Sequence, residues 1–146
     1  MSRGSVHIAS ADDPGAAPRF DAAFLSHPAD VSTLVWGYKM SREIARRMRC
    51  VVGEVSTTHP AFDPASAARC CPELDRPAAW DPAQVPRLVY SPQDDAAIEA
   101  WVRQTVQTTW HALGTCAMKP RAAGGVVDPR LRVHGVDRLM VADLSI

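Results

Sequence analysis

The chain has 146 residues, of which 47% are hydrophobic and 22% charged, a composition typical of a globular protein rather than a disordered one. Its 16 basic and 16 acidic residues balance, so no overall positive charge would attract nucleic acid or an anionic membrane. No apolar run approaches membrane-spanning length, and the first residues lack the apolar core of a secretory signal. Residues 1–146 are therefore expected to form one domain.

The cysteines give no sign of a metal site or a disulfide framework. Cys50, Cys70, Cys71 and Cys116 form no C-x-x-C pair, which argues against a zinc ribbon and a thioredoxin-like site. An adjacent pair such as Cys70 and Cys71 suits a simple bridge poorly, so we expect a reducing, intracellular compartment. The absence of H-E-x-x-H and G-x-S-x-G removes the usual signatures of zinc and α/β hydrolases.

A short strand is predicted at Ser5–Ser10, where Val6 and Ile8 alternate with residues of the other face. The sequence Asp-Asp-Pro-Gly at residues 12–15 then predicts a turn.

The first helix is predicted to begin at Pro28, because proline suits the first helical position, and to end near Arg49. Asp30 in the first turn and arginines in the last turn both favour the helix dipole. Apolar residues recur at helical spacing; they are Val31, Leu34, Val35, Tyr38, Ala45 and Met48, with Trp36, Met40 and Ile44 widening the stripe. We expect a packing helix with a basic end rather than a nucleic-acid-binding element.

Seven prolines interrupt residues 52–92 too often for long regular elements. Such a long loop is either a lid or contact surface, or a surface loop with no role of its own. After it, Ser91 and Asp94 predict a capping box for a second helix that runs to Val106, in which Glu99 can pair with Arg103. Turns follow at residues 124–125 and 128–129, with short strands near Leu131–Val133 and Leu139–Ala142.

The most informative stretch is residues 108–116, which read Thr-Thr-Trp-His-Ala-Leu-Gly-Thr-Cys. Residues 124–137 then begin with Gly-Gly-Val-Val-Asp-Pro, and residues 139–146 form an apolar run that ends in Ala-Asp-Leu-Ser-Ile. In this order the segments closely resemble the C-terminal part of the glucose-methanol-choline (GMC) flavoprotein oxidoreductases, most of all the fungal alcohol (methanol) oxidase branch. The resemblance implies an α+β portion of the substrate domain, at residues 1–146, whose last strand returns toward the FAD domain.

His111 is the candidate catalytic base. Imidazole can accept a proton near neutral pH, and oxidation of an alcohol by hydride transfer requires the hydroxyl proton to leave. By resemblance, the histidine of this motif faces the flavin and acts as the base; without the resemblance, packing or capping would be the commoner role. Trp110 could contact the cofactor through its large flat ring, with an ordinary core role as the alternative.

Asp143 is the second candidate, for binding the cofactor. In the resembled family the corresponding strand runs back into the flavin domain, and the acid at its end lies beside FAD. A turn-capping or helix-capping aspartate is the competing interpretation. Cys116 is expected to be a small, buried side chain rather than a nucleophile, and His134 is given no chemical role.

The resemblance implies FAD-dependent oxidation of a primary alcohol to an aldehyde, with hydride transfer to flavin and oxygen as the acceptor, as part of a longer enzyme. None of the eight glycines forms a G-x-G, so the glycine-rich loop that receives the FAD pyrophosphate in that family is not in this chain. The family's second catalytic histidine or asparagine also follows the strand that holds Asp143. We therefore expect a fragment that is inactive alone.

Several alternatives stay open. The chain could come from another GMC alcohol dehydrogenase or an aryl-alcohol oxidase, or it could be a non-catalytic binding or structural module. The expected partners are a small alcohol and molecular oxygen, without nucleic acid or membrane, and a homo-oligomeric complete enzyme is left open. A true alcohol oxidase would be peroxisomal, although no S-K-L address occurs here.

Overall fold

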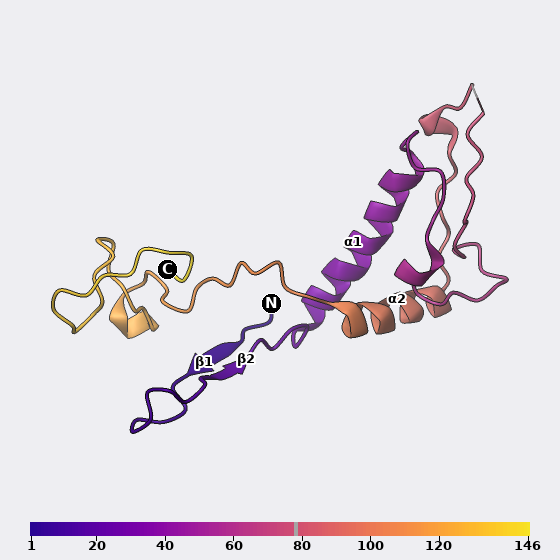
Figure 1. The fold of residues 1–146 in the computed structure, drawn as a ribbon. Helices are drawn as coiled ribbons and strands as arrows, with labels where there is room; N and C mark the ends of the chain where they lie inside the picture. Colours follow the sequence, from indigo (N-terminus) through magenta and orange to yellow (C-terminus); the bar gives the residue numbers. More distant parts are fainter. Residues whose placement is uncertain (78) are drawn as a thin grey trace. The chain divides into compact units, whose positions relative to one another are not determined.

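The computed structural model describes residues 1–77 and 79–146, which fall into two compact units (Figure 1). The first unit comprises Met1–Ser2 and Phe24–Val106, and the second comprises Arg3–Ala23 and Gln107–Ile146. Both helices belong to the first unit, and the only two-stranded sheet among the described residues belongs to the second. The predicted α+β class is confirmed.

Helix α1 spans Pro28–Arg46 and begins where the sequence predicts. The ring nitrogen Nδ1 of His27 accepts a hydrogen bond from the Ala29 N–H at 3.1 Å, which satisfies one of the free donors in the first turn. The helix ends earlier than the expected Arg49, because Arg47 leaves the helical conformation and forms the C-cap.

Helix α2 spans Pro92–Thr105 and begins with the predicted capping box. The Ser91 hydroxyl oxygen accepts the Asp94 N–H at 3.1 Å, and Asp94 Oδ2 accepts the Ser91 N–H at 2.8 Å. The predicted pair of Arg103 with Glu99 is also present, with Nη2 and Oε1 2.8 Å apart. Local sequence rules therefore account for the start of this helix and for one of its surface pairs.

The core of the first unit lies where α1 and α2 pack together. Its buried apolar side chains are Val31 of α1, Ile98 and Val102 of α2, and Ala68 of the intervening loop. The expected apolar stripe of α1 is only partly buried, because Leu34, Trp36, Met40, Ile44 and Met48 are all exposed. Its second buried residue is instead Arg42, at 4% exposure.

The proline-rich residues 52–92 form a long loop, as predicted. Apart from the 3-10 turns η1 (Ser56–Thr58) and η2 (Pro82–Gln84), the described part of this loop contains no helix and no strand until α2 begins. Arg42 fastens it to α1: the guanidinium donates to the carbonyl oxygen of Ala68 at 2.6 Å and to that of Arg69 at 3.0 Å. These bonds satisfy carbonyl groups that a loop without regular structure would otherwise leave unpaired.

The second unit contains an antiparallel hairpin, β1 (Ser5–His7) with β2 (Arg19–Asp21), in which Val6 faces Phe20. The expected strand Ser5–Ser10 is thus shorter than predicted, and β2 was not predicted. Strand pairing ends at His7 because its partner strand has only three residues.

Near the C-terminus, residues 117–142 form a small bridged cluster centred on Val127, which is fully buried. Val127 bridges to Met118 and to Val133, and Arg132 bridges to Met140. The strands expected near Leu131–Val133 and Leu139–Ala142 are therefore isolated bridges rather than strands, because tight turns interrupt the pairing. A short 3-10 turn, η3, spans Arg121–Ala123.

The chain exposes much more surface than compact domains do. Its solvent-accessible area is 10963 Å², whereas two separate compact units of this combined size would expose about 8,800 Å². Large apolar side chains contribute to the excess, among them Ile8 at 85% and Trp110 at 85% exposure.

Candidate functional site

The segment that carries His111 follows α2 and begins with a constrained backbone. Trp110 has a φ of 59°, in the left-handed region that side chains larger than glycine seldom adopt. The Thr108 hydroxyl oxygen accepts the Trp110 N–H at 2.9 Å and so stabilises this turn. Trp110 and His111 are both exposed, so the indole and imidazole rings are available to a ligand.

Two backbone hydrogen bonds place the His111 segment beside the last residues of the chain. The N–H of Gly114 donates to the carbonyl oxygen of Leu144 at 3.2 Å, and the N–H of Cys116 donates to that of Ser145 at 2.6 Å. Gly114 makes this approach with a φ of 82°, a conformation that glycine adopts without strain. The segments that hold the predicted base and the predicted cofactor ligand Asp143 are thus neighbours.

Asp143 lies in the turn that follows the last bridge of the cluster. Its Oδ1 accepts the Ser145 N–H at 2.8 Å. Hydrogen bonding by the Ser145 hydroxyl and backbone holds the pKa of the Asp143 carboxyl below its ordinary value. Asp143 is therefore an ionised acceptor near neutral pH. One carboxylate oxygen caps a turn, as the competing interpretation expected, and the other can accept a donor from a ligand.

Backbone hydrogen bonds of the bridged cluster hold the chain next to both segments. The N–H of Val126 donates to the Ala117 carbonyl oxygen at 2.9 Å, directly after the His111 segment, and the N–H of Val141 donates to the Leu131 carbonyl oxygen at 3.0 Å, directly before Asp143. A Cβ at Gly125 would lie 1.8 Å from the Lys119 carbonyl oxygen, so only glycine permits this close approach. The Gly124-Gly125 pair therefore serves the scaffold rather than the chemistry.

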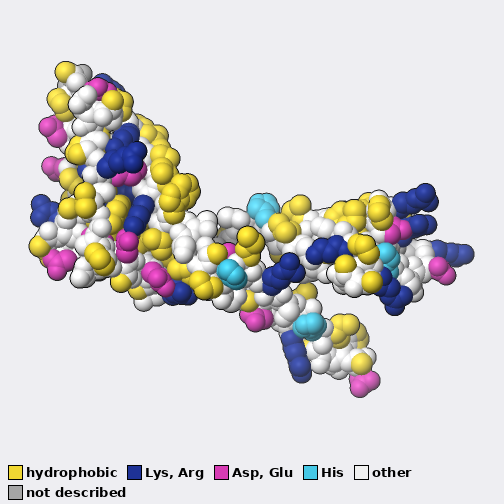
Figure 2. All heavy atoms as spheres, turned by 180° about the vertical axis from the view of Figure 1, so that it is seen from behind, with side chains coloured by type: hydrophobic (Ala, Val, Ile, Leu, Met, Phe, Trp, Pro, Cys, Tyr) yellow, Lys and Arg dark blue, Asp and Glu magenta, His cyan; other side chains and the backbone are white. Residues whose placement is uncertain are grey.

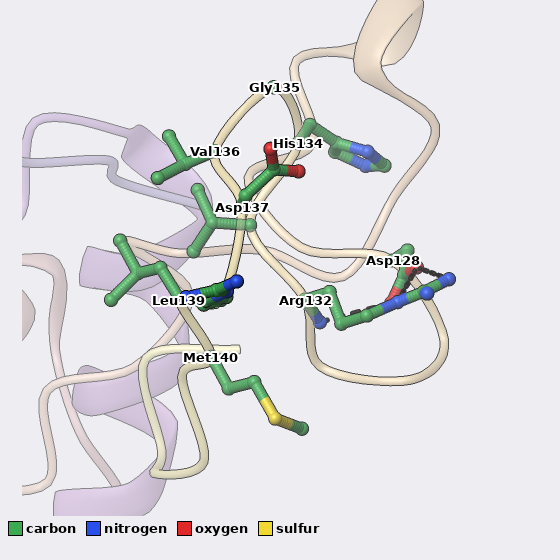
Figure 3. A pocket seen from close by; sticks show the side chains of 10 residues that line it. Asp128, Arg132, His134, Gly135, Val136, Asp137, Leu139 and Met140 are labelled. Atoms are coloured by element: carbon green, nitrogen blue, oxygen red, sulfur yellow. Dashed lines mark hydrogen bonds and ion pairs between the residues drawn. The ribbon is translucent and has the colours of Figure 1, made fainter.

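A hollow of about 420 Å³ is lined by residues of this cluster, from Asp128 to Met140 (Figure 3). Asp128 pairs with Arg132 at its edge, with Oδ2 and Nη2 2.8 Å apart, and the backbone and side chain of Arg132 lower the pKa of Asp128 to about 2. His134 places its Nε2 2.9 Å from the Lys119 carbonyl oxygen. These polar groups are used in holding the loop together, and we assign the hollow no catalytic role.

The arrangement at residues 110–111 and 143–145 fits a flavin in its chemistry. Asp143 offers a carboxylate acceptor for ribityl or ribose hydroxyl groups, the indole of Trp110 offers a flat apolar surface, and His111 offers a proton acceptor. Among residues 1–77 and 79–146, no group of three His, Cys, Asp or Glu side chains is placed to hold a metal ion.

Sequence reasoning missed three contributors to this site: the Thr108 hydroxyl and the carbonyl groups of Leu144 and Ser145. No local pattern predicts that two backbone segments about thirty residues apart will pair, and a left-handed tryptophan carries no compositional signal. Cys116 is half-buried, and its contribution to the site is its backbone N–H rather than its thiol.

Comparison with known proteins places this arrangement in context. A family model described as GMC oxidoreductase matches residues 1–146. Alcohol oxidase 1 of Komagataella phaffii and the alcohol oxidase of Candida boidinii are each 38% identical to the chain, over all of it and over 28% of their own length. Dehydrogenase citC of Monascus ruber is 37% identical, over the whole chain and 18% of its own length. The chain thus spans little more than a quarter of the alcohol oxidases that it matches.

No helix in the described part of the chain combines the length and the apolar character that crossing a membrane requires.

Proposed function

This chain belongs to the GMC oxidoreductase family, and on that premise we propose that it forms the C-terminal part of an FAD-dependent alcohol oxidase. The proposed reaction is oxidation of a primary alcohol to an aldehyde. The observation that carries the proposal is the pairing of the His111 segment with the Asp143 turn through Gly114 and Cys116, because it makes the segments of the proposed base and the proposed cofactor ligand neighbours.

The proposed role of His111 is to take the hydroxyl proton of the alcohol. An imidazole within hydrogen-bond reach of that oxygen lowers the barrier, because negative charge would otherwise build up on it. The exposed position of His111 leaves the ring accessible, and the hydrogen bond of the Trp110 N–H to Thr108 stabilises the turn directly before it. The chain therefore supplies the proton acceptor.

Trp110 and Asp143 would hold the flavin. The flat indole would pack against an aromatic or apolar part of the cofactor, and the ionised Asp143 would accept hydrogen bonds from its hydroxyl groups. Bound FAD supplies the acceptor for the hydride that leaves the alcohol carbon, and molecular oxygen is the proposed final acceptor. The residues that bind the phosphates are proposed to lie outside this chain.

The substitution His111→Ala in the complete enzyme tests the proposal. We expect the rate at which alcohol reduces the flavin, measured by rapid mixing, to fall about a hundredfold to ten-thousandfold. The flavin should stay bound. The loss falls on turnover rather than on alcohol binding, because a base helps most as the proton leaves.

The matched control is His134→Ala. The His134 ring contacts the Lys119 carbonyl oxygen, so its removal should leave flavin reduction near the parent rate. Reduction at close to the parent rate in His111→Ala would show that His111 is not the base and would overturn the proposal.

A second candidate is a GMC dehydrogenase that passes its electrons to an acceptor other than oxygen. Dehydrogenase citC, which is 37% identical over the whole chain, supports this alternative, because its identity is close to that of the alcohol oxidases. Measuring whether oxygen reoxidises the alcohol-reduced flavin, with release of hydrogen peroxide, decides between the two.

A further inference from the structure

Helix α1 carries apolar side chains on two opposite faces. Val31 and Tyr38 turn toward α2 and the loop, where Val31 is 4% exposed and Tyr38 is 5.6 Å from the ring of Trp101. Trp36, Met40 and Ile44, spaced four residues apart, lie on the other face. A helix that is apolar on two faces is normally buried on both.

The outer face, defined as Trp36, Met40 and Ile44, is open in this chain. The three side chains are 62%, 41% and 56% exposed. Hydrophobic side chains gather along the side of the first unit that α1 forms (Figure 2). An exposed tryptophan and methionine next to one another are typical of the centre of a protein interface.

A hollow of about 380 Å³ adjoins the outer face. Leu88 and Tyr90, from the end of the long loop, line it together with α1. The hollow therefore offers a largely apolar surface to an incoming segment.

The rim of the hollow favours an acidic occupant. Lys39, Arg47 and Arg87 line it. Lys39 pairs with Asp95 and Arg47 pairs with Glu43, so among the described residues Arg87 is the cation of this rim that has no ion-pair partner. Both carboxylate oxygens of Glu43 are already used, because Oε1 accepts the Leu88 N–H at 2.7 Å and Oε2 pairs with Arg47.

We propose that the outer face of α1 is the surface on which the remaining part of the GMC enzyme packs, through apolar side chains bordered by Asp or Glu. This inference rests on the proposed function, because it requires the chain to be part of a longer enzyme. The alcohol oxidases that the chain matches extend over far more sequence than the 28% it covers, and the chain exposes about 2,000 Å² more than compact units of its size. The occupant is thus a surface of the same polypeptide.

The test is site-specific photo-cross-linking in the complete enzyme. The photoreactive residue p-benzoylphenylalanine replaces Met40, whose apolar side chain it resembles in character, and the cross-linked peptides are identified by mass spectrometry. We expect one dominant cross-link within a single polypeptide, to a segment outside residues 1–146 that contains acidic residues. The same label in place of Gln104, which is exposed near the end of α2, serves as the matched control and should not reach that segment.

Cross-linking between two polypeptides through this face, or no cross-link from position 40, would overturn the inference. Failure of the proposed function would give a different result. Alcohol would then not reduce the flavin, but the cross-link from position 40 would still form. The charge reversal Arg87→Glu adds a second measurement. We expect it to lower the temperature at which the holoenzyme unfolds, and an unchanged temperature would contradict the acidic border.

Discussion

At the scale of single residues, the buried pair of Arg42 and Glu54 organises the first unit by joining α1 to the long loop. The guanidinium meets both carboxylate oxygens at 2.7 Å, and Glu54 Oε2 also accepts the Cys71 N–H at 2.9 Å. Burial raises the pKa of Glu54, but the hydrogen bonds from Arg42 and Cys71 outweigh it and hold the pKa below 4.5. The pair therefore stays ionised near neutral pH and ties the loop to α1.

We expect Glu54→Gln to lower the free energy of unfolding of this chain by about 3 kcal/mol, since it leaves a buried charge without its partner. Because the folded-state pKa is lowered, the stabilisation is present above pH 4.5, the ordinary pKa of the group, and is lost as pH falls through the folded value. Urea unfolding measured across this pH range should show that the free energy of unfolding falls as the pH falls. This decrease should be smaller in Glu54→Gln than in the parent protein.

Glu99→Gln is the matched control for this prediction. Its pair with Arg103 is about half exposed on both sides, so its removal should cost less than about 1 kcal/mol. If Glu54→Gln costs no more than Glu99→Gln, the buried pair does not stabilise the unit as described. The sequence did not reveal this pair, because it joins an arginine outside the apolar stripe of the helix to a loop residue with no local pattern.

At the scale of elements, the sequence predicts best those features that residues close together in the chain determine, such as the starts of helices. The first turns of α1 and α2 begin as expected, because proline and a capping side chain act within a few residues. The hairpin strand β2 was missed because three residues cannot show an alternating pattern. The exposure of the outer face of α1 was missed as well, since periodicity identifies apolar faces but not what covers them.

The capping box of α2 gives a prediction at this scale. Asp94 is 3% exposed, and its Oδ1 also accepts the Ser66 hydroxyl at 2.7 Å, so one carboxylate joins the helix start to the loop. We expect Ser91→Ala to lower the free energy of unfolding by about 1 kcal/mol and to speed hydrogen exchange at the Asp94 and Asp95 amides. Ser91→Thr should restore both. An exchange rate at Asp94 that Ser91→Ala leaves unchanged would show that the box is not what protects the turn.

At the scale of the whole chain, few apolar side chains of residues 1–77 and 79–146 are buried; they are Val31, Ala68, Ile98, Val102 and Val127. Few buried apolar side chains are therefore available to offset the entropy of ordering each compact unit. The units also carry exposed residues whose roles are proposed to depend on the rest of the enzyme, with the outer face of α1 in one unit and Trp110 and His111 in the other. Packing within the longer enzyme is thus expected to supply part of the stability.

The same reasoning predicts how the isolated chain treats FAD. Tight binding of a dinucleotide requires backbone N–H groups that surround its phosphates, usually from a glycine-rich loop at a helix N-terminus. None of the eight glycines forms a G-x-G, and the ligands proposed here, Trp110 and Asp143, can contact only part of the cofactor. We therefore expect purified chain mixed with FAD to lose the flavin on gel filtration, whereas the complete enzyme retains it. A stoichiometric yellow complex of the isolated chain would show instead that residues 1–146 contain a complete flavin site.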